Sequence, residues 1–254
     1  MAKRERVPIG PVSIDSITMA MAVRRVAMHL ASGASHSFLI SGVNAHFVNV
    51  AQKDHEFARL LSEQDLNLAD GASLVLASRL LGEHLPQRVT GIDLMNELCG
   101  LAAQTGKRVY LLGGAIGAAT RAARNLQSRF PGLKIAGIDR PPMGREFDDD
   151  VVERTRDRIR RAHPDMLFVC FGVPSQEYWI HRFGADLCVP VVMGNGAALD
   201  VLAGFFHRPP TLIQNLNLEW LYRLLLEPRR LWRRYLLGNI NFVFLIFRQI
   251  LRNA

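Results

Sequence analysis

The second half of the chain alternates short apolar segments with stretches of helical periodicity. Met166–Phe171 is the clearest of these segments and contains only apolar residues. A strand without polar positions is typical of a parallel sheet whose two faces are both covered by helices. We predict further strands at 108–112, 133–138 and 189–193, with helices at about 118–130 and 150–162. The pattern indicates an α/β fold with a Rossmann-like, mostly parallel sheet flanked by helices.

The first half follows the same alternation with shorter segments. Its periodicity predicts helices at 16–29, 44–62 and 72–81, with strands at 37–41 and 66–69. Hydrophobic residues make up 49% of the 254 residues, which is enough to bury a full core and excludes intrinsic disorder. The three cysteines have no ligand spacing, so a disulfide scaffold or a zinc module is not expected.

Positive charge is concentrated at the C-terminal end of the chain. The formal net charge is +8, and residues 205–254 contain eight arginines but only two acidic residues. The same segment contains nine of the twenty aromatic residues. We therefore expect an α/β domain at 1–204, followed by a helical, basic and aromatic appendage at 205–254. A nucleic-acid-binding module would spread its basic residues over the folded surface, so no nucleic-acid partner is expected.

The segment Tyr235–Leu251 is largely apolar, with a narrow polar stripe. A wide apolar face beside arginines is typical of a helix lying on an anionic membrane surface. The alternative is a helix that packs on its own domain or on another subunit. No stretch reaches about 18 uninterrupted apolar residues, so we expect no transmembrane helix, and we expect no secretory signal.

Ligands of parallel α/β sheets bind beyond the carboxyl ends of the strands. Asp70 lies at such an end, directly after the strand at 66–69. Its carboxylate could take a proton from a bound hydroxyl as a general base. The alternative is that Asp70 caps the following helix and that Gly71 eases the turn.

Two more loops at this edge contain candidate ligand contacts. Gly113 and Gly114 end a strand and precede a helix, an arrangement that suits either a phosphate-binding turn or a plain tight turn. Asp139 ends the next strand, as the ribose-binding acid of a nicotinamide site does, and a nicotinamide oxidoreductase is therefore one alternative function. Gln176 and Glu177, in the loop predicted at 172–177, could bind the sugar or base of a ligand. The alternative for that loop is a proline turn with a capping residue.

The run Asp148–Asp150 contains the Asp-x-Asp pattern with which some sugar-nucleotide enzymes hold a metal. It also stands directly before a predicted helix, where acidic residues complement the helix dipole. We favour the helix start and therefore expect neither a metal nor a cofactor.

Several segments resemble, in order, the WecG/TagA/CpsF family of bacterial glycosyltransferases, which includes N-acetylmannosaminyltransferases. The matching segments are Val43–Ala45, Leu68–Ala72, Arg88–Leu94, Leu111–Gly114, Phe171–Trp179, Gly194–Gly204, Arg208–Pro210, Leu218–Arg223, Glu227–Arg230 and Arg233–Tyr235. Gly42 departs from the family, which often has Thr at that position.

The resemblance implies an inverting, metal-independent hexosyltransferase. Such an enzyme moves a hexose of the N-acetylmannosamine type from a UDP-sugar donor to a polyprenyl-diphosphate-linked sugar acceptor, in the synthesis of cell-surface polysaccharide. It would be cytoplasmic and peripheral on the inner face of the bacterial membrane. A homo-oligomer is left open.

The resemblance also implies roles for individual residues. Asp70 would be the base that deprotonates the acceptor hydroxyl. Asn44, Arg88 and Thr90 would lie near the donor sugar, and Gln176 would bind the donor. Arg223, Arg230 and Arg233 would fold over the site and stabilise the departing UDP, which removes the need for a metal because guanidinium groups can offset the charge of the diphosphate.

Overall fold

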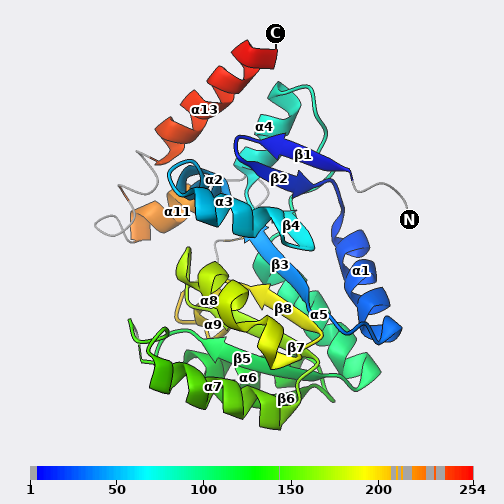
Figure 1. The fold of residues 1–254 in the computed structure, drawn as a ribbon. Helices are drawn as coiled ribbons and strands as arrows, with labels where there is room; N and C mark the ends of the chain where they lie inside the picture. The colour runs from blue at the N-terminus through cyan, green and yellow to red at the C-terminus, as the bar shows by residue number, and fades with distance from the viewer. Residues whose placement is uncertain are drawn as a thin grey trace.

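The computed structural model describes residues 5–142, 144–206, 210, 213, 219–226, 232 and 238–253. At its centre is a six-stranded sheet in the order β4-β3-β8-β7-β5-β6 (Figure 1). Every neighbouring pair is parallel, which confirms the predicted α/β fold. The strands are β3 (Phe38–Val43), β4 (Leu66–Ala69), β5 (Arg108–Gly113), β6 (Lys134–Asp139), β7 (Met166–Cys170) and β8 (Val191–Gly194).

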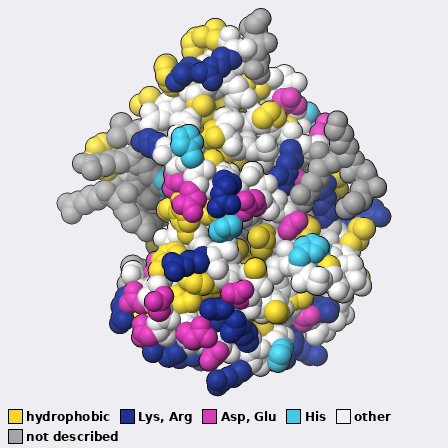
Figure 2. Space-filling view, in the orientation of Figure 1, with side chains coloured by type: hydrophobic (Ala, Val, Ile, Leu, Met, Phe, Trp, Pro, Cys, Tyr) yellow, Lys and Arg dark blue, Asp and Glu magenta, His cyan; other side chains and the backbone are white. Residues whose placement is uncertain are grey.

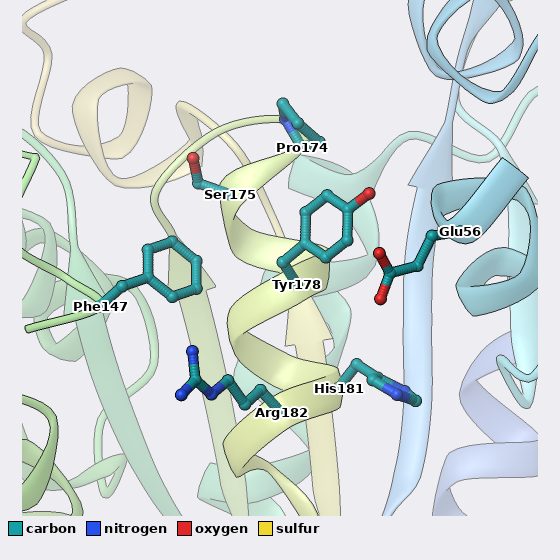
Figure 3. Close-up of a pocket in the computed structure, with 7 residues that line it drawn as sticks. All are labelled: Glu56, Phe147, Pro174, Ser175, Tyr178, His181 and Arg182. Carbon is teal, nitrogen blue, oxygen red and sulfur yellow. The ribbon is translucent and has the colours of Figure 1, made fainter. Parts of the chain in front are cut away.

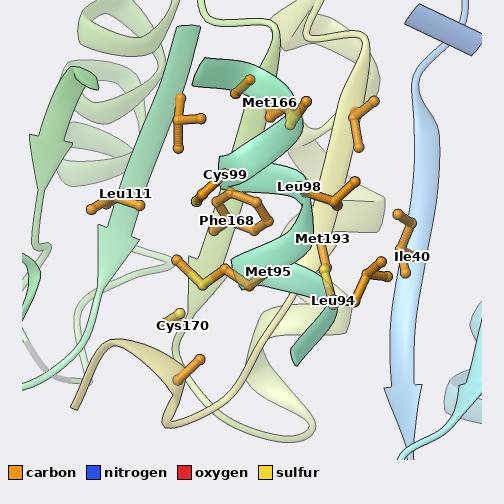
Figure 4. Packing of buried hydrophobic residues seen from close by; sticks show 14 of the residues in the cluster. Ile40, Leu94, Met95, Leu98, Cys99, Leu111, Met166, Phe168, Cys170 and Met193 are labelled. Carbon is orange, nitrogen blue, oxygen red and sulfur yellow. The ribbon is translucent and has the colours of Figure 1, made fainter. Parts of the chain in front are cut away.

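Helices cover both faces of the sheet. One face packs against α1 (Met19–Ser32), α5 (Gly91–Thr105), α6 (Ala118–Arg129) and α9 (Ala198–Leu202). The other face packs against α7 (Asp149–Ala162), α8 (Ser175–Phe183) and the short 3-10 helix at Ala185–Leu187. Figure 4 shows how Met95 and Leu98 of α5 lie over Phe168 of β7 and Met193 of β8. Burial from both sides explains why β7 and β8 have no polar positions.

A third core lies beyond the β4 edge of the sheet. It contains an antiparallel hairpin of β1 (Arg6–Ile9) and β2 (Val12–Asp15), together with α2 (Ala45–Ala51), α3 (His55–Ser62) and α4 (Ala72–Leu80). Asp15 joins the hairpin to the sheet, since its buried carboxylate accepts a hydrogen bond from the Asn67 backbone N–H at 2.9 Å.

The structure differs from the sequence-based expectations at several elements. The hairpin and α5 were not predicted. The helix predicted at 44–62 is two helices, because Asp54 accepts a hydrogen bond from Phe57 N–H and starts α3. The first helix begins at Met19 rather than Ser16, since Thr18 caps it. The loop predicted at 172–177 ends early, and Gln176 and Glu177 lie in the first turn of α8.

Two helices of the C-terminal segment are described, α11 (Glu219–Leu226) and α13 (Gly238–Asn253). Phe242 and Ile246 of α13 are buried in the third core. The amide of Gln249 bonds to the hairpin at Gly10 N–H and Pro8 O, and Asn49 Nδ2 of α2 donates to Gly238 O at 2.7 Å. One side of α13 therefore packs on its own chain.

The other side of α13 is apolar and exposed. Its exposed large hydrophobic residues are Ile240, Val243, Phe244, Phe247 and Leu251. In Figure 2, hydrophobic and basic side chains lie next to each other at this end of the molecule. None of the described helices has the length and apolar character that crossing a membrane requires.

Candidate active site

Asp70 lies at the carboxyl edge of the sheet, directly after β4. Its backbone N–H donates to Val43 O at 2.8 Å, which ties it to the end of β3. The neighbouring Ala69 O accepts from Val89 N–H at 2.9 Å, and this bond brings in the segment that leads to α5. The backbone at the half-buried Asp70 is thus tied to two other segments of the chain.

The capping alternative placed Asp70 at the start of the following helix. The N-cap of α4 is Gly71, and Asp70 stands one residue before it.

Gly42 and Gly91 lie close to the Asp70 carboxylate, and Asn195 lies beside Gly91. A β-carbon built on Gly42 would lie 3.0 Å from Asp70 Oδ2, and one on Gly91 would lie 3.5 Å from the same oxygen. The β-carbon on Gly91 would also lie 2.4 Å from Asn195 Oδ1, so Asn195 shares this space. The two glycines allow three chain segments to meet at one carboxylate, which fixes its position.

Asn44 and Thr90 start the helices that border this space. Asn44 Oδ1 accepts from His46 N–H at 3.0 Å and caps α2. Thr90 Oγ1 accepts from Asp93 N–H at 3.1 Å and donates to the Asp93 carboxylate, and so caps α5 immediately before Gly91. Arg88 is half-buried two residues earlier. Asn44, Arg88 and Thr90 lie near the same strand ends as Asp70. The structure therefore brings these four predicted site residues together.

Gln176 and Glu177 are buried beneath the loops that follow β7 and β8. Gln176 Oε1 accepts from Gly172 N–H at 3.2 Å and from Gly196 N–H at 2.8 Å. Gln176 Nε2 donates to Glu177 Oε1 at 2.7 Å. Burial raises the pKa of Glu177 to about 8, and the hydrogen bond from Gln176 opposes that rise. In this structure, Gln176 joins the loops that follow β7 and β8.

Gly113 and Gly114 form a tight turn against the end of β7. A β-carbon on Gly113 would meet Cys170 O at 2.5 Å, and φ is +103° there, so only glycine fits. Gly114 N–H donates to Cys170 O at 3.0 Å, and Ala115 N–H donates to Asp200 Oδ1 at 2.8 Å. These two amides therefore already have partners within the fold.

The acid of the nicotinamide alternative also has a partner. Arg158 donates to both carboxylate oxygens of Asp139 at 2.9 Å, and the Arg140 backbone N–H donates to one of them. An ion pair of this kind leaves little capacity for a ribose hydroxyl.

The carboxylates at 148–150 lie at the start of α7, as expected. Asp148 accepts from Arg145 Nε at 2.6 Å, and Asp150 accepts from Arg154 at 2.7 Å. Among the described residues, no group of three or more His, Cys, Asp or Glu side chains could hold a metal ion.

A surface pocket of about 540 Å³ lies apart from these residues, on the outer side of α8 (Figure 3). Tyr178 stands at its centre and donates to Asp54 Oδ2 at 2.6 Å, while Glu56 and His181 lie to one side of it. None of the predicted site residues lines this pocket. We therefore place the candidate site at the carboxyl edge around Asp70.

The tail arginines cannot be placed against this site. Arg230 and Arg233 lie outside the described residues, and Arg223 belongs to α11 with its side chain outside the description. Their predicted contact with a leaving group stays a prediction.

Comparison with known proteins identifies the type of enzyme. Residues 7–254 match the model of the glycosyl transferase WecG/TagA/CpsF family. The chain belongs to this family. It is a glycosyltransferase, and this membership decides against the nicotinamide alternative.

Curated relatives cover most of the chain. A protein of Bacillus subtilis (strain 168), named N-acetylglucosaminyldiphosphoundecaprenol N-acetyl-beta-D-mannosaminyltransferase, is 37% identical over 200 residues, which are 78% of this chain and 75% of the relative. A Staphylococcus aureus (strain NCTC 8325 / PS 47) protein of the same name is 32% identical over 232 residues, or 90% and 87% of the two chains.

Asn195 is the residue at this edge that the sequence analysis did not single out. The signal was present, since Asn195 is a polar residue directly after an apolar strand, as Asp70 is after β4.

Proposed function

We propose that this glycosyltransferase moves N-acetylmannosamine, or a closely related hexose, from a UDP-sugar to a polyprenyl-diphosphate-linked sugar. The observation that carries the proposal is the carboxylate of Asp70, which lies close to Gly42 and Gly91 at the carboxyl edge of the sheet. The names of the relatives supply the sugars: in each, an N-acetylmannosaminyl group goes to an N-acetylglucosaminyl diphospholipid.

In the proposed reaction Asp70 acts as the general base. Its carboxylate takes the proton of the acceptor hydroxyl while that oxygen forms a bond to the anomeric carbon of the donor. The bond from this carbon to the phosphate oxygen breaks, and UDP leaves with the electron pair. A single displacement inverts the anomeric centre and needs one base, which is the role proposed for Asp70.

The leaving diphosphate needs positive charge, and Arg223, Arg230 and Arg233 are the proposed source. Guanidinium groups bind phosphate oxygens through paired hydrogen bonds and remain charged at any physiological pH. Removing one such stabiliser costs about 10²–10³-fold in rate. Arg230→Gln is therefore expected to lower kcat on every acceptor, including water-soluble ones.

The exposed side of α13 supports a peripheral position on the inner face of the cytoplasmic membrane. Its apolar residues would enter the lipid interface, with Arg248 and Arg252 of the same helix near anionic headgroups. α13 packs on α2, and the N-cap of α2 is Asn44 at the site. The helix α2 has seven residues and is therefore about 10 Å long. A lipid-linked acceptor at α13 would consequently be close to Asp70.

The decisive experiment is UDP release from a panel of UDP-sugars, with a short-chain polyprenyl-diphosphate N-acetylglucosamine as acceptor. We expect release that requires the acceptor and that is fastest with UDP-N-acetylmannosamine or a close relative of it. Absence of acceptor-dependent release with every UDP-sugar would overturn the proposal.

A further inference from the structure

Asn195 carries a buried hydrogen-bond donor that the fold does not use. Its side chain is 8% exposed, and its Nδ2 has no hydrogen-bond partner among the described residues. Buried polar groups in folded proteins are nearly always paired, so an unpaired donor calls for an explanation. Leucine has a similar size and would fill this position without the free-energy cost of a buried, unpaired donor.

The neighbours of Asn195 suggest what the donor is for. Its Oδ1 and the Asp70 Oδ2 both lie close to the point where a Gly91 β-carbon would be, at 2.4 Å and 3.5 Å. The amide and the proposed base therefore flank the same residue, Gly91, at the N-terminus of α5. We expect a sugar whose hydroxyl reaches Asp70 to bring its ring substituents toward Asn195.

The backbone around Asn195 is fixed before any ligand binds. Asn195 N–H donates to Val169 O at 2.8 Å, and its carbonyl accepts from Ala198 N–H at 3.0 Å. The next residue, Gly196, donates to Gln176 Oε1 at 2.8 Å. Because the backbone is held on both sides, a hydrogen bond from the side chain to a ligand costs little conformational entropy.

We propose that Asn195 is a specificity-determining residue whose Nδ2 donates a hydrogen bond to the carbonyl oxygen of an N-acetyl group on the sugar next to Asp70. The inference rests on the proposed function. A neutral amide donor suits a neutral carbonyl acceptor, whereas a uronic acid or a phosphate is matched by arginine or lysine. An N-acetyl group occurs on both sugars of the proposed reaction, so the test needs one arm for the donor and one for the acceptor.

The experiment measures kcat/KM for Asn195→Leu, which removes the donor, and for Asn195→Asp, which keeps the shape but offers only acceptors. The donor arm compares UDP-N-acetylmannosamine with UDP-mannose. The acceptor arm compares short-chain polyprenyl-diphosphate N-acetylglucosamine with its glucose counterpart. We expect both variants to lose about 10- to 100-fold on the acetylated substrate that Asn195 contacts, and little on its unacetylated counterpart.

Asn96→Leu is the matched control. Asn96 is also 8% exposed, and it lies on α5 with its Nδ2 bonded to Ile92 O at 3.1 Å. We expect its substitution to leave both substrate preferences unchanged, while thermal unfolding of all three variants reports any loss of stability.

The outcomes separate the two proposals. Loss of the acetyl preference in one arm supports the role of Asn195 and identifies the sugar that it contacts. An equal loss on all substrates, or no loss, overturns that role. If the wild type releases no UDP in any combination, the proposed function fails instead.

Discussion

Gly42 lies directly against the carboxylate of Asp70, since a β-carbon at Gly42 would be 3.0 Å from Asp70 Oδ2. We expect Gly42→Ala to push this carboxylate away by a few tenths of an ångström. Misplacing a reacting group by about 1 Å can cost 10²-fold in rate, so we expect kcat to fall by roughly 10-fold. Gly100→Ala is the control, because its β-carbon would meet only the Phe130 ring, at 3.3 Å. Unchanged kcat in Gly42→Ala would show that the position of Asp70 is not critical.

Asp70→Asn tests the base directly. The amide keeps the shape of the side chain but cannot accept the proton, and general-base catalysis contributes about 10²–10⁴-fold. We expect a loss of that size in turnover, with UDP binding and the melting temperature close to those of the wild type. More than half of the wild-type activity would remove Asp70 from this role.

Activity should survive chelation of divalent metals. Asp148 and Asp150, the carboxylates of the Asp-x-Asp pattern, are bonded to Arg145 and Arg154 and start a helix. We expect UDP release in excess EDTA to match that of the untreated enzyme. Loss of activity that Mn²⁺ or Mg²⁺ restores would contradict this assignment, and Asp148→Asn would then be the next variant to examine.

Glu177 should make stability depend on pH. Burial raises the pKa of this carboxyl from its ordinary 4.5 to about 8, so the folded chain holds the proton more tightly than the unfolded chain does. The free energy of unfolding therefore falls as the pH rises from about 4.5 to about 8. In Glu177→Gln this contribution is absent, so we expect its melting temperature to fall less over that range. An equal fall of the melting temperature with pH in the variant and in the wild type would contradict the prediction. Substitution of an exposed glutamate, Glu83→Gln, serves as the control.

Phe247→Glu tests the membrane surface of α13. Burying a phenylalanine in an apolar phase is worth about 1.5–3 kcal/mol, so binding to anionic vesicles should weaken by roughly 10-fold or more. Turnover of a water-soluble acceptor should not change. Met28→Glu on α1 is the matched control, with 62% exposure against 56% for Phe247. Equal vesicle binding by both variants would count against α13 as the contact.

A point substitution is preferable to truncation for this test. Deleting residues 236–254 would remove Phe242 and Ile246 from the third core and uncover the side chains beneath them. The truncated protein would then change in stability as well as in membrane binding.

The sequence allowed the parallel sheet and its carboxyl edge to be predicted, because β5, β7 and β8 are largely apolar on both faces and each ends at, or within two residues of, a glycine. The N-terminal hairpin escaped prediction because its two strands have four residues each and Pro8 interrupts one of them. The helix α5 escaped as well, although Thr90 and Asp93 form its start signal.

At the site, chain order identified Asp70, since it directly follows a predicted strand, whereas Asn44 was identified from the resemblance to the family. Chain order could not show that Gln176 and Glu177 are buried beneath the loops, because that depends on which side of α8 meets the sheet. Nor could it show that Gly91 and Asn195, over a hundred positions apart in the sequence, meet at one carboxylate.

The bonds between Gln249 and the hairpin at Pro8 and Gly10 join segments that are 241 and 239 residues apart in the sequence. During synthesis the hairpin is made long before Phe242 and Ile246, which complete the same core. That core therefore stays open until these two residues have been made, while the strands of the central sheet can already pair. A nascent chain arrested before residue 238 should consequently be more sensitive to protease in the hairpin than in the sheet.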